Sequence, residues 1–180
     1  MELKASCSDL NVAGAWWKAV WRLKIPSEIK MCVWSASHQW IPTLANLANR
    51  KMQVDCLCVR CHHFPKSTLH ALWTCPGLKS VRTCVPFVKK SWHQGMANIL
   101  DFFSSCLWLL QQQELEVLCV MLWRIWFQRN QIVHASIPIE LSRIFSWALE
   151  YISEFSTANS RTSPKIVVSL AGSNGWIAPA

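Results

Sequence analysis

The densest group of metal-binding residue types in the 180-residue chain lies between residues 58 and 75. Cys58 and Cys61 are separated by two residues, and His70 and Cys75 follow them. Two cysteines at this spacing can direct both thiolates at one ion, and four soft or borderline ligands without a carboxylate are typical of a closed tetrahedral zinc site. Such a set leaves no position for water, so the sequence predicts one structural Zn²⁺ that also orders a loop with few apolar residues.

Three neighbouring residues, Cys56, His62 and His63, compete for places in this ligand set. Cys56 lies only two positions before Cys58, which is tight for a zinc knuckle, and His62 directly follows a ligand and would need a reversal of the chain. The alternative to a metal site is a group of free cysteines with a surface histidine. The remaining cysteines are expected to be thiols of the core or the surface; they are Cys7, Cys32, Cys84, Cys106 and Cys119.

The cysteine content and the first residues also bear on the compartment. The count of nine is odd, and residues 1–15 contain acidic residues without a continuous apolar segment. A secreted disulfide scaffold is therefore not expected, and the sequence favours the nucleus or the cytosol. A membrane span is not expected either, because the apolar run from Val117 to Trp123 stops at Arg124 and a span needs about 20 apolar residues.

Apolar residues repeat at helical spacing through much of the chain, so we predict a mostly α-helical fold. Short helices are expected over residues 14–23, over residues 26–40 and after an N-cap at Thr43. Ser67 is expected to cap a further short helix that Pro76 and Gly77 end. Longer apolar helices are expected over residues 96–110, 115–126 and 138–152.

This pattern predicts a small zinc-stabilised helical domain followed by an apolar helical bundle or linker. The expected divisions are a flexible N-terminus (1–13), the zinc-binding domain (14–92), the helical linker region (93–157) and a flexible tail (158–180). Residues 166–168 could form a strand, but only with a partner outside this helical set.

Trp108, Trp123 and Trp126 are expected in the core, and Arg129 with Asn130 is expected to cap helix carbonyls rather than to face phosphates.

The charge balance favours anionic partners, because 18 basic residues face 10 acidic ones and the net charge is +8. No acidic residue interrupts the stretch from Arg60 to Met96, and the rings of His62, His63, Phe64 and Trp73 could stack on unpaired bases. The alternative is a solvated basic surface around a core tryptophan. The candidate nucleic-acid-binding residues are Arg60, Lys66, Lys79, Arg82, Lys89 and Lys90.

The order of these elements resembles a known family. The segment from Trp17-Lys18 to Pro26, with Lys30, Trp34, Ile41-Pro42-Thr43, Leu47 and Arg50, leads into the Cys58/Cys61 pair and then into His70-Ala71-Leu72-Trp73-Thr74-Cys75-Pro76. It is similar to the zinc-binding domain that follows the reverse transcriptase in plant non-LTR (LINE-type) retrotransposon polyproteins. Leu122 to Val133 resembles the helical W-x-I-W-x-x-R-N stretch that precedes the ribonuclease H domain there, so the resemblance covers about residues 16–135.

The resemblance implies metal ligands at Cys58, Cys61, His70 and Cys75. The chain departs from the family pattern at Lys66, which is usually acidic, at Cys32, which is usually aromatic, and at Arg82, which is often tryptophan. The tail around Trp176 lies where a ribonuclease H domain would begin, so we expect a fragment of a retroelement without its enzymes.

No catalytic constellation is evident in the sequence. The three aspartates, Asp9, Asp55 and Asp101, are far apart, whereas a two-metal nuclease or polymerase site needs convergent carboxylates. A redox pair at Cys58 and Cys61 lacks the usual βαβ context, and a cysteine nucleophile with His70 or His134 is only formally available.

We therefore expect a non-catalytic zinc-binding module with weak, non-specific binding to RNA or DNA. The alternative is a zinc-stabilised protein-interaction module, whose apolar helices over residues 96–152 dock onto reverse transcriptase or ribonuclease H parts. That alternative is motivated by the density of apolar residues in those helices, which could leave a large apolar patch exposed in an isolated domain.

Overall fold

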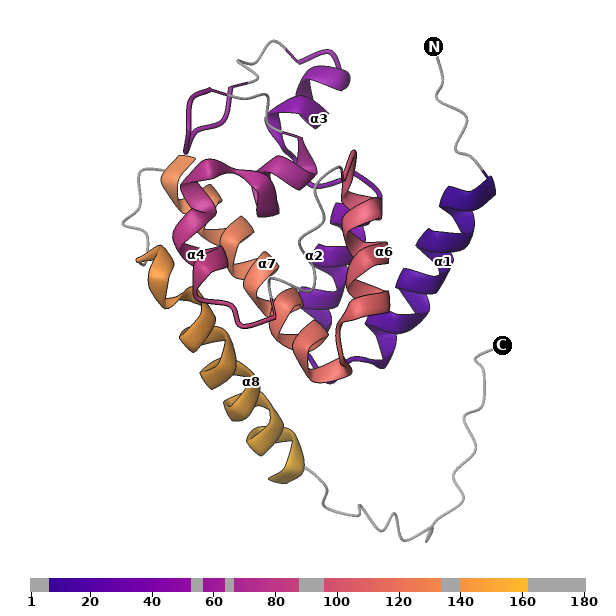
Figure 1. Cartoon of the computed structure of the whole chain (residues 1–180), viewed down its shortest axis with the longest axis vertical. Helices are drawn as coiled ribbons and strands as arrows, with labels where there is room; N and C mark the ends of the chain where they lie inside the picture. The colour runs from indigo at the N-terminus through magenta and orange to yellow at the C-terminus, as the bar shows by residue number, and fades with distance from the viewer. Residues whose placement is uncertain (1–6, 53–56, 64–66, 88–95, 134–139, 162–180) are drawn as a thin grey trace, which may run out of the picture.

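The computed structural model describes residues 7–52, 57–63, 67–87, 96–133 and 140–161 (Figure 1). These residues form helices and no strand, which confirms the predicted mostly α-helical fold. None of the helices in these ranges combines the length and the apolar character that crossing a membrane requires. The possible strand at residues 166–168 lies outside the described part.

The first two helices form an antiparallel pair joined by a short turn. Helix α1 (Cys7–Arg22) begins before Gly14, where the apolar pattern predicted its start, and α2 (Ser27–Ser37) follows Pro26 as expected. Pro26 has an extended ψ of 146°, so the chain turns there before the second helix begins. Trp16 and Val20 of α1 are buried together with apolar residues of α2, which include Ile29 and Val33.

The third helix, α3 (Leu44–Asn49), is short, and the side chains of Thr43 and Asn46 hold its first turn in place. Thr43 Oγ1 accepts a hydrogen bond from the Asn46 amide at 3.2 Å, which confirms the predicted N-cap. Asn46 Nδ2 in turn donates to the carbonyl oxygens of Gln39 at 2.7 Å and Ile41 at 2.9 Å. The buried Asn46 therefore ties the helix to the turn that precedes it.

Three short helical turns follow in the part of the chain that carries the second half of the ligand set. They are the π-helical turn η1 (His70–Thr74), the 3₁₀ turn η2 (Pro76–Leu78) and α4 (Lys79–Thr83). Ser67 Oγ accepts from the His70 amide at 3.1 Å, which confirms the predicted cap. The sequence pattern did not predict α4, because its five residues are too few to show a helical period.

The remaining helices include α7, which with 22 residues is the longest of the described helices. They are α6 (Ile99–Leu109), α7 (Gln112–Val133), the short turn η3 (Leu141–Arg143) and α8 (Ile144–Arg161). A capping box starts α6: Asn98 Oδ1 accepts from the Asp101 amide at 3.0 Å, and the Asp101 carboxylate accepts from the Asn98 amide at 3.2 Å. Helix α8 continues to Arg161, past Thr157 where a polar tail was expected.

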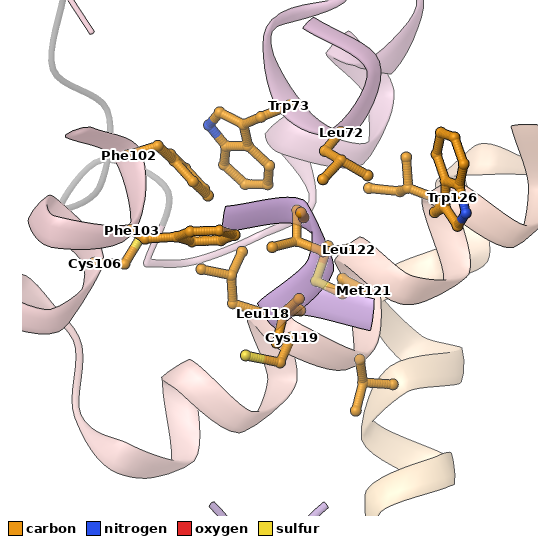
Figure 2. Packing of buried hydrophobic residues seen from close by; sticks show 14 of the residues in the cluster. Leu72, Trp73, Phe102, Phe103, Cys106, Leu118, Cys119, Met121, Leu122 and Trp126 are labelled. Atoms are coloured by element: carbon orange, nitrogen blue, oxygen red, sulfur yellow. The ribbon is translucent and has the colours of Figure 1, made fainter. Parts of the chain in front are cut away.

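Helix α7 is the centre of the fold. It contacts α2, η1 and α8, and Figure 1 shows α8 lying along its outer side. The core around it is drawn in Figure 2, where Trp73 faces Phe102 and Phe103 lies above Leu118. The rings of Trp16 and Phe103 are stacked with centroids 4.0 Å apart, so α1 and α6 are joined through aromatic contact.

One buried cluster includes residues of both predicted regions, from Trp16 in α1 to Ala148 in α8. Of the tryptophans expected in the core, Trp126 is buried and Trp123 is partly buried against the cluster. The expectation for Trp108 was wrong, because its side chain is 86% exposed. The buried face of α6 holds Phe102 and Cys106, and at 100° per residue Trp108 points to the opposite side of the helix.

Candidate metal centre

The four predicted ligands converge. One atom from each of Cys58, Cys61, His70 and Cys75 lies within 4.8 Å of the others, and these residues form a zinc-binding cluster. The Sγ atoms of Cys58 and Cys75 are 3.8 Å apart, and Cys61 Sγ is 3.4 Å from His70 Nε2. Ideal tetrahedral zinc bonds of about 2.3 Å to sulfur and about 2.0 Å to nitrogen give separations of about 3.8 Å and about 3.5 Å. The donor set therefore fits one zinc ion.

A tight turn presents the first two cysteines to the ion. The His62 amide donates to the Cys58 carbonyl at 2.8 Å, and the Arg60 amide points at Cys58 Sγ at 3.4 Å. The Arg60 amide therefore helps to hold this sulfur in place beside the other ligands. His62 adopts a left-handed φ of 55°, which turns the chain away from the centre.

The competing residues do not join the ligand set. His62 and His63 are exposed, and His63 Nδ1 contacts the Cys61 carbonyl oxygen instead of the centre. Cys56 lies outside the described residues. Within the described part of the chain, no other group of three or more metal-ligand side chains is present.

The π-helical turn η1 explains how His70 and Cys75 can serve one ion. In an α-helix, residues five positions apart lie about 140° apart around the axis and point to different sides. Here the Cys75 amide donates to the His70 carbonyl at 3.1 Å, a bond across five positions that widens the turn. The chain then becomes extended at Cys75, with φ −53° and ψ 130°, and both ligands reach the centre.

Burial governs the electrostatics of the ligand set. Removal from water is the largest of the effects that together raise the pKa of Cys75 to about 12; the neighbouring Cys58 and Cys61 act in the same direction, and a hydrogen bond from the Gly77 backbone opposes them. Without a metal this thiol is protonated at neutral pH, so binding of zinc must release its proton. Three thiolates and a neutral imidazole around Zn²⁺ then leave a centre with a net charge of −1.

Two arginines hold the backbone around this anionic centre. Arg60 donates from Nη1 to the Ala71 carbonyl at 2.9 Å and from Nη2 to the Ile125 carbonyl at 2.6 Å. Its guanidinium therefore joins the cysteine turn, the π-helical turn and α7. Burial lowers the pKa of Arg60, and the nearby thiol groups of Cys75 and Cys58 counter this effect.

Arg82 binds the same segment from the other side. Its Nη1 donates to the carbonyl oxygens of Trp73 and of Cys75, the latter at 2.9 Å. Arg82 therefore places a cation against the backbone of the last ligand. Burial lowers the pKa of Arg82, and Cys75 opposes that shift.

The other predicted nucleic-acid-binding residues are placed differently. Lys79 is exposed, whereas Lys66, Lys89 and Lys90 lie outside the described residues. Trp73 is buried in the core and cannot stack on a base without disrupting it, as the alternative interpretation held. Phe64 also lies outside the described residues.

Arg129 has neither of the two roles considered for it. Its side chain is buried, Nη1 donates to Asn130 Oδ1 at 2.9 Å, and the guanidinium lies 5.1 Å from the centre of the Trp126 ring. The Cys58 thiol raises the pKa of Arg129 against the larger lowering by burial, so this arginine also belongs to the surroundings of the metal centre. The helical period alone gave no signal for this placement.

The remaining thiols are structural, as expected. Cys106 and Cys119 are buried, Cys32 packs against the same core, and Cys84 is exposed. Burial raises the pKa of both Cys32 and Cys106 to about 12. Cys56 and the side chain of Cys7 lie outside what the structure describes.

The comparison with protein families gives one match. Residues 5–82 match the family described as zinc-binding in reverse transcriptase. No curated protein and no solved structure matches the chain. The match includes all four ligands and ends within α4. It therefore ends before the helical half of the molecule, which consists of α6, α7, η3 and α8. This N-terminal segment is therefore similar to a reverse transcriptase zinc-binding domain, and Cys58, Cys61, His70 and Cys75 are its zinc-binding residues.

Proposed function

We propose that the chain is a non-catalytic, zinc-stabilised module from a plant LINE-type retroelement that binds single-stranded nucleic acid without strong sequence preference. The family match supports the zinc-binding part of this proposal. The four protein ligands fill a tetrahedral zinc, so the centre is suited to holding structure and offers no free position for a reacting water.

The uneven distribution of charge carries the nucleic-acid part of the proposal. Residues 1–100 contain 13 lysines and arginines against 4 aspartates and glutamates, whereas residues 101–180 contain 5 against 6. The whole positive charge of the protein therefore belongs to the half that carries the zinc cluster. Such an excess of positive charge favours the binding of a polyanion. Phosphate contacts made by lysine and arginine supply most of the sequence-independent affinity for nucleic acids.

A salt titration tests this function. Fluorescence anisotropy of the zinc-loaded protein with a labelled oligouridine should show binding that weakens linearly in a plot of log affinity against log salt, with a slope of about −0.7 for each phosphate contact. Oligothymidine and a mixed-sequence strand should bind with similar affinity. No binding at low salt would overturn the proposal.

A second candidate function is docking onto another protein through the helical half. Most apolar residues that motivated it are buried within the chain itself, and Trp108 is the residue that still favours it, because it is 86% exposed at the end of α6. Pull-down by separately purified reverse transcriptase or ribonuclease H domains, lost in Trp108→Ala, tests this alternative.

A further inference from the structure

A connected group of aromatic rings lies on the outer side of the first two helices. Trp17 and Trp21, one turn apart on α1, are in edge contact with centroids 4.9 Å apart. Trp17 lies 5.3 Å from Trp34 of α2, and Trp34 meets Trp40 edge-on at 4.9 Å. We call these four tryptophans the aromatic face.

Two rings of the aromatic face are open to solvent, and Trp17 and Trp34 between them are partly buried. Trp21 is 41% exposed and Trp40 is 54% exposed, whereas Trp16, next to Trp17 in the sequence, is fully buried. In an edge-to-face contact only one of the two rings gives its face to the partner, so ring faces remain available for a planar ligand. Exposed tryptophans cost solvation free energy that the fold itself does not recover.

Basic side chains surround this face. Lys18, Arg22 and Lys24 are exposed on α1 and the turn after it. Lys30 Nζ donates to the Trp21 carbonyl at 3.2 Å and lies 5.6 Å from the centre of the Trp21 ring. Its ammonium group is therefore held beside an open aromatic ring, an arrangement that suits a phosphate next to a stacked base.

Two acidic side chains are near, and both already have partners. Glu28 Oε1 accepts from Tyr151 at 3.5 Å. Glu116 is buried, and its Oε1 accepts from the Lys24 amide at 2.8 Å and from Gln112 Nε2 at 3.1 Å. These partners are neutral, so both carboxylates keep their charge, but the four basic side chains, Lys18, Arg22, Lys24 and Lys30, outnumber them.

A pocket continues the basic edge of the aromatic face. Its volume is about 420 Å³, and it lies between the α1–α2 turn and the end of α8. Lys24 and Lys30 line one side, and polar side chains of α8 line the other, among them Ser156, Asn159 and Ser160. Ammonium, hydroxyl and amide groups together are suitable donors for a phosphate group.

We propose that single-stranded nucleic acid binds across this face, with bases stacked on Trp21 and Trp40 and a backbone phosphate in the pocket between Lys24 and Lys30. The proposal rests on the proposed nucleic-acid-binding function and assigns it to a surface different from the zinc-proximal residues. The arginines of that region support this choice, because the guanidinium groups of Arg60 and Arg82 already bind backbone carbonyls.

Tryptophan substitutions test the stacking part. Trp21→Ala and Trp40→Ala should each weaken the binding of a labelled oligouridine of about 15 nucleotides by about 5- to 150-fold. Trp108→Ala removes a tryptophan that is even more exposed but lies on α6, so it should leave the affinity unchanged. A strand of the same length with abasic sites in place of bases should bind more weakly, and it should not distinguish Trp21→Ala from the unaltered protein.

Lysine substitutions test the phosphate part. Lys24→Ala and Lys30→Ala should each reduce the steepness of the log–log salt dependence by about 0.7, the value of one phosphate contact on a single strand, and the abasic strand should show the same change. Lys51→Ala is the matched control, because Lys51 is an exposed lysine directly after the C-cap of α3. Zinc content and the circular dichroism spectrum of every variant should equal those of the unaltered protein.

These experiments distinguish a failure of the proposed binding surface from a failure of the proposed nucleic-acid-binding function. If the unaltered protein binds oligouridine and the substitutions at Trp21, Trp40, Lys24 and Lys30 act no more strongly than those at Trp108 and Lys51, this surface is wrong and the proposed function stands. If the unaltered protein binds no strand at low salt, both are overturned, and the exposed aromatic face is assigned to a protein partner instead.

Discussion

The zinc-proximal segment and the helical half of the molecule obtain their order in different ways. Around the metal centre, the described residues of the zinc-proximal segment (57–63 and 67–83) form only short turns of helix, and metal ligands and arginine–carbonyl hydrogen bonds connect them. In the helical half, α6 and α7 bury continuous apolar faces. The zinc-proximal segment also buries Leu72, Trp73 and Leu78 in the shared core, but its short turns present no continuous apolar face. Metal binding therefore supplies part of the free energy that orders it. We expect four kinds of substitution to test this difference, with effects that decrease from the zinc ligands to the N-caps.

Removal of one zinc ligand should have the largest effect. Cys58→Ser or Cys75→Ser should reduce the zinc content from about one per chain to near zero, and the ligand-bearing turns should unfold, because the apparent free energy of structural zinc binding, about 10–16 kcal/mol, is also folding free energy. Elemental analysis and hydrogen exchange of residues 57–83 measure both. The exposed Cys84 provides the control, since Cys84→Ser should keep the metal.

A core truncation tests whether the two regions unfold together. Phe103→Ala removes the ring that stacks on Trp16 and should lower the free energy of unfolding by about 3–5 kcal/mol. Because one buried cluster joins α1 to α8, denaturant unfolding should remain a single transition when followed by circular dichroism and by zinc release. Two separated transitions would contradict the shared core, and Trp108→Ala should change the stability by less than about 0.5 kcal/mol.

Arg60 is the residue whose side chain physically joins the two regions. Arg60→Met keeps much of the apolar length but loses the bonds to the Ala71 and Ile125 carbonyls, and it should destabilise the protein by about 1.5–3 kcal/mol. Chemical denaturation of the zinc-loaded protein measures the change. Arg60→Lys should recover only part of the loss, since lysine cannot span two carbonyls with a planar fork. A neutral result for Arg60→Met would show that the link is dispensable.

The N-caps should give the smallest effects, one at α6 in the helical half and one at α3, which precedes the zinc-proximal segment. Asn98→Ala removes the capping box of α6 and should cost about 1 kcal/mol. Thr43→Ala should cost a similar amount at α3, and hydrogen exchange should show the loss at Asn46, whose amide donates to Thr43. Equal costs would indicate that local capping is independent of how each region is held together.

Much of the metal centre could be predicted because its chemistry is local. The spacing of Cys58 and Cys61 defines a zinc knuckle, and the short set of soft ligands leaves few alternatives. The bend that brings His70 and Cys75 together was not predictable, because it depends on a π-helical turn whose extra residue produces no hydrophobic period. The predicted basic surface near the zinc remains a prediction for Lys79, while Arg60 and Arg82 are engaged with the backbone.

The helices themselves follow from apolar periodicity, with differences at their ends. Helix α1 starts before Gly14 and α8 continues beyond Thr157, because polar residues can extend a helix once part of it is packed. The same periodicity placed Trp108 in the core, where the structure does not have it. A helix with apolar residues on more than one side does not reveal which side its neighbours will cover.

The ligands, the helical class and the basic half of the chain could therefore be predicted from the residues, because thiolate and imidazole chemistry, helical period and charge are properties of the residues themselves. The roles of the tryptophans depend on how the helices pack. Trp16 and Trp73 are buried, whereas Trp21, Trp40 and Trp108 are exposed. The physical reason is that burial depends on which faces of α1, α2 and α6 meet other helices, and residues distant in the sequence supply those contacts.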